Sequence, residues 1–295
     1  MQILIIGASG QVGRVFYDLY KDRPDTAVLG TYNSRPAEGM AALDMTDINS
    51  VSAVFEKFRP DTVILSSALT AVDFCETKPA EAMRVNAEGT RNVISVCGAY
   101  KARPVYLSTE YVFDGKNGPY DEDAEPNPIN AYGRSKLAGE KFVLGCPFKP
   151  LVIRSTVIYH YDRASLNFVM QLITRLPASQ RMRVPTDQIS NPTYAPDLVR
   201  AVDALLSKNC TGIYNVVGSD RLSRYDFALK ACMVLGLDKR FVDGVDTASL
   251  AQAAPRPLSA GLVTAKLTRD TGYKPMSAAM GLSKFYSVWQ EGTKK

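Results

Sequence analysis

Short apolar runs alternate with segments of helical periodicity along the first half of the chain. The runs cover residues 2–6, 27–32, 62–68, 104–109 and 151–155. After the first run, apolar side chains recur at the spacing that gives a helix one buried face, at Val12, Val15, Phe16 and Leu19. Strands that alternate with such helices are typical of βαβ units. The pattern therefore predicts an α/β fold with a doubly wound parallel sheet.

The alternation of runs weakens in the second half of the chain, beyond Ile158. Helices are expected near residues 166–176, 197–207, 223–236 and 278–290, and apolar runs at 182–185 and 212–217. This half therefore predicts a smaller α/β lobe. A strand and a helix near residues 193–218 are expected to return to the sheet.

Length and composition restrict the class of protein. The chain has 295 residues, of which 46% are hydrophobic, and this excludes intrinsic disorder and leaves room for one α/β unit with a smaller lobe. No run reaches the ~18 apolar residues of a membrane helix, and the net charge of +5 is scattered along the chain. The five cysteines form no C-x-x-C pair. We expect a cytoplasmic protein with no metal site and no nucleic-acid or membrane partner.

Three glycines follow the first apolar run, in the segment GASGQVG at 7–13. Such glycines allow a tight turn and a close approach of the backbone to a pyrophosphate at the helix N-terminus. A position between a strand and an amphipathic helix is the context in which this motif binds a dinucleotide. We therefore predict a Rossmann-type NAD(P)-binding domain over residues 1–157, and mainly a substrate-binding lobe over 158–295. The expected cofactor contacts in this loop are Gly7, Ser9, Gly10, Gln11, Val12 and Gly13.

The end of the second apolar run bears on the choice of cofactor. The segment TYNSR at 31–35 lacks the carboxylate that would bind the ribose of NAD. The guanidinium of Arg35 favours the 2′-phosphate of NADPH, although Arg35 could also be a solvated loop charge. We therefore expect NADPH, with NADH as the alternative. Further cofactor contacts are expected at Asn33, Ser34, Arg35, Asp44, Met45, Ser67 and Ala68.

A tyrosine and a lysine stand four residues apart in YGRSK at 132–136. On a helix this spacing places Tyr132 and Lys136 on one face, where the ammonium would lower the phenol pKa of about 10. The same lysine could hold the ribose of the cofactor. Thr109 ends the fourth apolar run, and ligands of open α/β sheets bind at the carboxyl ends of strands. We predict that these three side chains converge on one crevice; the alternative is two exposed helix residues and a strand-end cap.

Together these motifs make the chain resemble the extended short-chain dehydrogenase/reductases, and within them the dTDP-4-dehydrorhamnose reductases (the RmlD-like family). The resemblance spans residues 2 to about 267 and also rests on TAVDFCE (70–76), VNAEGT (85–90), STEYVFDG (108–115), NAYGRSKLAGE (130–140), TDQISNPTYAPDL (186–198) and RPLSAGLVTAKL (256–267). It implies reduction of the 4-keto group of a nucleotide-activated 6-deoxy sugar by NAD(P)H. In that reaction Tyr132 would donate the proton, Lys136 would be its electrostatic partner, and Thr109 would bind the carbonyl oxygen.

The resemblance also implies a nucleotide-sugar substrate and its contacts. The family has a tryptophan at the sugar site where this chain has Val157, so we expect a different sugar. Arg256 would bind the diphosphate. Asn86 resembles a helix asparagine near the active-site water, although an ordinary hydrogen bond within the helix would explain this asparagine equally well. Substrate contacts are expected at Thr70, Glu110, Val157, Gln188, Asn191 and Arg256.

Two alternatives to a reductase are an epimerase or dehydratase of the same superfamily, and a non-catalytic NADP-binding subunit like the methionine adenosyltransferase β subunit. Whether the protein forms a homodimer stays open.

Overall fold

A seven-stranded parallel sheet forms the centre of the computed structural model, which describes residues 1–293. The strands follow the order β11-β6-β5-β4-β1-β2-β3, and all neighbours are parallel. The strand order reverses between β1 and β4, as in a doubly wound sheet, so the predicted Rossmann-type fold is confirmed. The strands are β1 (Gln2–Ile6), β2 (Ala27–Tyr32), β3 (Ala41–Ala42), β4 (Thr62–Leu65), β5 (Arg103–Thr109), β6 (Leu151–Ser155) and β11 (Gly212–Asn215).

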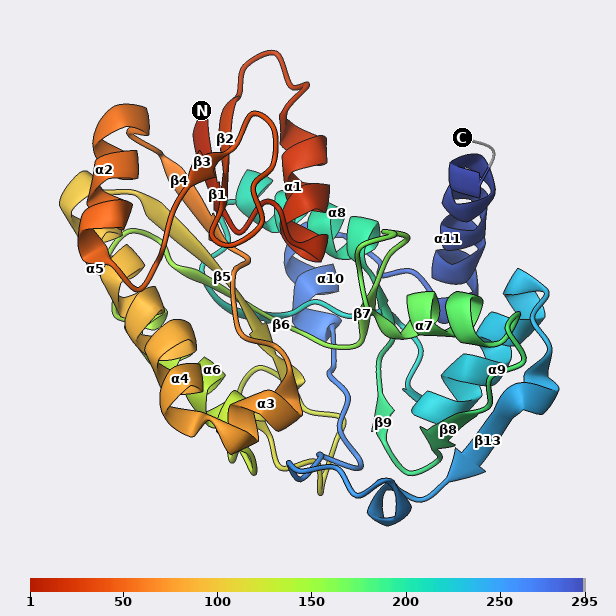
Figure 1. The fold of residues 1–295 in the computed structure, drawn as a ribbon. Helices are drawn as coiled ribbons and strands as arrows, with labels where there is room; N and C mark the ends of the chain where they lie inside the picture. Colours follow the sequence, from red (N-terminus) through yellow and green to blue (C-terminus); the bar gives the residue numbers. More distant parts are fainter. Residues whose placement is uncertain (294–295) are drawn as a thin grey trace.

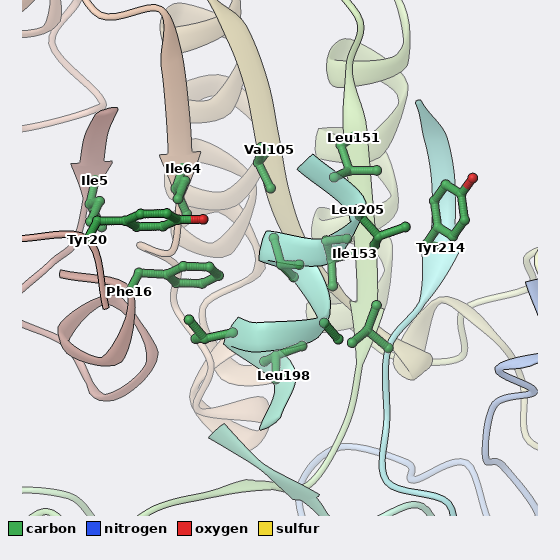
Figure 2. Close-up of a cluster of buried hydrophobic side chains, with 14 of the residues drawn as sticks. Ile5, Phe16, Tyr20, Ile64, Val105, Leu151, Ile153, Leu198, Leu205 and Tyr214 are labelled. Carbon is green, nitrogen blue, oxygen red and sulfur yellow. The ribbon is translucent and has the colours of Figure 1, made fainter. Parts of the chain in front are cut away.

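Helices cover both faces of this sheet (Figure 1). One face packs against α1 (Gln11–Tyr20), α8 (Ala195–Ser207) and α10 (Ala265–Thr271). The other packs against α2 (Ile48–Phe58), α5 (Thr90–Tyr100) and α6 (Ala131–Leu144). Because side chains alternate along a strand, Ile3 and Ile5 of β1 enter the first core and Leu4 and Ile6 the second. Figure 2 shows how α1 and α8 close the first core over β1, β4, β5 and β6.

A third core lies in the smaller lobe, shown at the right of Figure 1. It contains α7 (Phe168–Arg175), α9 (Arg224–Leu235) and α11 (Ala278–Thr293). Two of the small sheets pair β8 (Met182–Pro185) with β13 (Val242–Val245), and β9 (Ile189–Ser190) with β12 (Leu222–Ser223). A third pairs β7 (Ile158–Tyr159) with β10 (Thr193–Tyr194). Between these elements the chain crosses back to add α8 and β11 to the sheet, and the domain limit at residue 157 stays a prediction.

The segment after β4 is divided into several short helical pieces. It forms α3 (Val72–Thr77), α4 (Pro79–Met83), a π-helical stretch at Arg84–Gly89 and then α5. Such π-helical insertions occur often at functional sites.

No helix within residues 1–293 has both the length and the apolar character needed to cross a membrane. Within the same residues, no cluster of His, Cys, Asp and Glu could hold a metal ion.

Candidate active site

A cavity of about 440 Å³ opens at the carboxyl ends of β1, β4, β5 and β6. The glycine loop lies on one side of it, and α6 and the start of α9 contribute to the other walls. Eight of the residues predicted from sequence line this single cavity. They are Gly10, Gln11, Val12, Ala68, Thr70, Thr109, Tyr132 and Val157.

The glycine loop has a shape that only glycine permits at two positions. Gly7 has φ of 86°, and a Cβ there would lie 2.8 Å from the backbone nitrogen of Ser67. A Cβ on Gly13 would lie 2.2 Å from the carbonyl oxygen of Gly7. No side chain caps the start of α1 at Gly10, so the first backbone N–H groups of the helix face outward. This loop therefore offers the cradle that a pyrophosphate requires.

Tyr132 lies in the first turn of α6, which Asn130 caps by accepting a hydrogen bond of 2.8 Å from the Gly133 nitrogen. Burial raises the pKa of Tyr132, and a hydrogen bond with the Thr109 side chain opposes that shift. The phenol is therefore neutral at physiological pH and carries a proton to donate. This corrects our expectation that the nearby ammonium sets the pKa of Tyr132, because burial is the larger effect.

Lys136 is buried one helical turn beyond Tyr132, and its Nζ lies 3.9 Å from the centre of the Tyr106 ring. Burial lowers the pKa of this lysine to about 7, against the opposing charge of Glu140. Removal from water outweighs the attraction because the carboxylate of Glu140 is already paired with another residue. Lys136 is not among the residues that line the cavity.

Glu140 belongs to a buried network behind Lys136. Arg154 donates from Nε and Nη2 to the two carboxylate oxygens of Glu140, at 3.0 and 2.7 Å. Ser108 donates from Oγ to the same carboxylate at 2.5 Å. Paired and hydrogen-bonded buried charges of this kind are costly to break, so the network fixes α6 against β5 and β6.

The position of Asn86, in the π-helical stretch, is explained by its contacts within the protein and does not require a ligand. Its Nδ2 donates to the carbonyl oxygen of Leu69 and to Ser135 Oγ, both at 3.0 Å. Its Oδ1 accepts from the Leu69 nitrogen at 2.8 Å. The side chain thus clamps the segment after β4, which forms the cavity wall, to α6.

A second, smaller cavity of about 70 Å³ lies near the end of β2. It brings together four predicted cofactor contacts, Asn33, Asp44, Met45 and Ser67, and adds Arg84, which sequence reasoning missed. Arg84 donates to Thr46 Oγ1 at 3.0 Å. Its position depends on the turn from α4 into the π-helical stretch, which no sequence pattern indicated. The predicted Ser34 and Arg35 are exposed and do not line this cavity.

Four predicted substrate contacts do not line the main cavity. Glu110 is buried, accepts hydrogen bonds from Thr156 Oγ1 and the Gly261 nitrogen, and has its pKa raised by burial to about 7. Arg256 pairs with Asp73 at 3.0 Å. The other two also have protein partners: Asn191 with Gly218 and Leu262, and Gln188 with Thr247 and Gln252. These four side chains hold wall segments together, and direct contact with substrate stays a prediction.

Arg224 is a cavity residue that sequence reasoning missed. It begins α9, directly after the cap residue Ser223. A charged residue in the first turn of a helix usually faces solvent, so the sequence carries no signal that this side chain turns inward.

Comparison with known proteins finds relatives over most of the chain. Residues 1–290 match the model of the RmlD substrate binding domain. A dTDP-4-keto-6-deoxy-D-glucose reductase of Streptomyces niveus is 33% identical over 256 residues, which cover 86% of this chain and 85% of the relative. Methionine adenosyltransferase 2 subunit beta of Xenopus tropicalis is 29% identical over 273 residues, 90% of this chain and 81% of the relative.

A solved structure is similar over nearly its whole length. It is dTDP-4-dehydrorhamnose reductase of Bacillus anthracis in complex with NADP, which matches with a TM-score of 0.87 and 32% identity over 97% of this chain and 99% of that one. The resemblance drawn from the sequence motifs is therefore confirmed. The chain belongs to the RmlD family, the family of the dTDP-4-dehydrorhamnose reductases.

Proposed function

We propose that the protein reduces the 4-keto group of a nucleotide-activated deoxy sugar with hydride from NADPH. The observation that carries this function is the shared cavity, in which the glycine loop, Thr109 and Tyr132 meet. The protein is an oxidoreductase, NADPH is its cofactor with NADH as the alternative, and a nucleotide sugar is its substrate. The Streptomyces and Bacillus relatives carry the names of reductases for such sugars.

The chain's own geometry supports the binding of a dinucleotide. The cradle formed by Gly7 and Gly13 and the free N–H groups at the start of α1 suit its pyrophosphate. The cavity near Asn33 and Arg84 suits its adenosine end, and Lys136 is the proposed ligand of its nicotinamide ribose. When bound, the cofactor supplies hydride to the carbonyl carbon.

The remaining chemistry is transfer of a proton to the carbonyl oxygen. We assign this proton to Tyr132, because its phenol is protonated at neutral pH and lines the cavity beside Thr109. Thr109 supplies a second hydrogen bond to the same oxygen, and such donors stabilise the charge that develops there. Thr109 and Tyr132 line the same cavity, so both hydroxyls could reach one acceptor there.

A panel of nucleotide-linked 4-keto sugars, followed by loss of NADPH absorbance, tests the function. We expect Tyr132→Phe to lower kcat about 10²–10⁴-fold, the usual contribution of general acid catalysis, with NADPH affinity unchanged. Tyr286→Phe is the matched control, since this tyrosine is exposed on α11 and should leave turnover unchanged. Turnover of the Tyr132→Phe variant at the parental rate would assign the proton to another group.

The same assay separates the alternatives. An epimerase or dehydratase converts sugar without net consumption of NADPH, because the cofactor is regenerated in each cycle. The likeness to a methionine adenosyltransferase subunit favours a second candidate, a protein that binds NADPH without turnover. That candidate predicts NADPH binding in a fluorescence titration and no reduction of any sugar in the panel.

The proposal includes a cytoplasmic location. The five cysteines are free and four of them are buried, as in proteins of reducing compartments. Cell fractionation tests the location. Homodimerisation is the assembly that we propose to test, by light scattering of the purified protein.

A further inference from the structure

Arg224 brings a positive charge into the cavity that also contains Thr109 and Tyr132. A guanidinium is always charged in proteins. Its position is fixed, because the Arg224 backbone nitrogen donates to the Gln188 carbonyl at 2.9 Å and α9 is capped by Ser223. Its guanidinium lies over the Phe168 ring, with Cζ 5.1 Å from the ring centre.

Within residues 1–293 no acidic side chain forms an ion pair with this charge, although Glu110 attracts it. Asp226, two residues further along α9, accepts a hydrogen bond of 2.6 Å from Ser223. Glu110 is occupied by Thr156 and Gly261, and burial raises its pKa to about 7. No ion pair with Arg224 is present in the described part of the chain, whereas Arg256 nearby is paired with Asp73.

Arg224 is half-buried and lines the cavity without an ion-pair partner, and a guanidinium in that position is suited to bind an anionic ligand. The cavity also contains Thr109 and the proposed proton donor Tyr132, which would hold the reacting carbonyl. The ligand of Arg224 must therefore belong to the part of the substrate next to the reacting carbonyl.

We propose that Arg224 binds an oxyanion attached directly to the ketosugar, and so determines which substrates are accepted. Two sources have this chemistry, the sugar-linked phosphate of the nucleotide diphosphate and a carboxylate on the sugar ring. A guanidinium binds either through two parallel hydrogen bonds. The proposal rests on the proposed function for the identity of the sugar, but the oxyanion site itself does not depend on turnover.

Calorimetry with the full-length protein tests this site without catalysis. We expect Arg224→Gln to weaken binding of a nucleoside diphosphate about 10- to 100-fold, as for a lost charge-assisted pair, and binding of the nucleoside alone to stay unchanged. Arg224→Lys should be intermediate, because lysine keeps the charge but lacks the planar fork. Arg240→Gln is the control, since that side chain is 85% exposed and paired with Asp238.

Two further readouts separate a binding role from a structural one. NADPH affinity should be equal in Arg224→Gln and the parent, and the melting temperature of the variant should be equal or higher, because an unpaired charge is removed. If diphosphate binding is unaffected while sugar 1-carboxylates or uronic acids bind more weakly, the oxyanion is the carboxylate. Unchanged affinity for both classes, or a fall in melting temperature together with NADPH affinity, would overturn the proposal. Failure of the reductase assay alone would leave the site intact and reject only the proposed function.

Discussion

At the residue scale, the sequence predicted which proposed catalytic side chains share a cavity, but it did not predict their electrostatics. Thr109 and Tyr132 were predictable because each stands at the end of a strand or the start of a helix, and topology brings those positions to one edge of the sheet. Arg224 was not predictable, since its direction depends on how α9 packs in the other lobe. The state of Lys136 depends on burial and on the pairing of Glu140, which no spacing reveals.

The lowered pKa of Lys136 makes a prediction about stability and pH. The unfolded lysine titrates near pH 10.5 and the folded one near pH 7, so between these values the unfolded state binds more protons and stability rises with pH. Below pH 7 the lysine is charged in both states, so the full cost of burying its charge lowers the stability of the fold. We expect Lys136→Met to raise the free energy of unfolding at pH 7 by about 1–4 kcal/mol.

Urea denaturation of both proteins from pH 6 to 10 provides the measurement. The stability advantage of Lys136→Met should shrink as the pH rises above 7. The buried lysine of the parent then loses its charge in the folded state, so its burial costs less. An advantage that is independent of pH would mean that packing, and not the charge, distinguishes the two proteins.

Val157 lines the cavity with φ of 44°, which is unusual for a β-branched residue. A tryptophan buries 150–250 Å² and would occupy space in this cavity, in which we expect the sugar to bind. We expect Val157→Trp to weaken productive binding of the native sugar by about 1–3 kcal/mol through overpacking, with NADPH affinity unchanged. Steady-state kinetics on the sugar panel measure this loss. Faster turnover of dTDP-4-dehydrorhamnose than of every other sugar by the parent would contradict a role of Val157 in specificity.

At the scale of elements, long segments were predictable and short ones were not. The expected runs at 2–6 and 151–155 coincide with β1 and β6, and the helix expected at 223–236 is α9. The two-residue strands β7, β9, β10 and β12 carry no periodicity, because alternation needs at least four residues to be recognised. The π-helical stretch within 79–100 is set by how the segment packs on α6 and could not be inferred from apolar spacing.

The turn from β1 into α1 gives a prediction at this scale. A Cβ on Gly13 would lie within 2.2 Å of backbone, so Gly13→Ala must displace the loop that approaches the pyrophosphate. We expect it to lower NADPH affinity at least tenfold and to destabilise the fold by about 1–3 kcal/mol. Fluorescence titration and thermal unfolding measure the two effects.

Gly98→Ala is the matched control for that substitution. Gly98 lies within α5, and a Cβ there would meet nothing within 4 Å. Alanine favours a helix over glycine, so this variant should be more stable by up to about 1 kcal/mol and bind NADPH normally. Similar losses in both variants would show that the space around Gly13 is not the cause.

At the scale of the whole molecule, the order of elements along the chain decides what can fold alone. The sheet formed by the first 157 residues would lack β11 at the edge of β6 and α8 over one face. Leu198, Val199, Val202 and Leu205 of α8 are all buried in that face. We expect the fragment 1–157 to aggregate or to unfold without a cooperative transition in circular dichroism. A single sharp transition would show that the fragment is a domain by itself.

The position of α10 has a consequence for synthesis on the ribosome. Leu267 of this helix completes the core that β1 and α1 begin, although about 250 residues separate them in the chain. Contacts of such long sequence separation form late and slow the folding of a domain. Part of this apolar sheet face therefore stays uncovered until α10 has been translated, although α1 and α8 cover the rest earlier. Cells that produce the protein rapidly should depend on chaperones to shield this face during most of elongation.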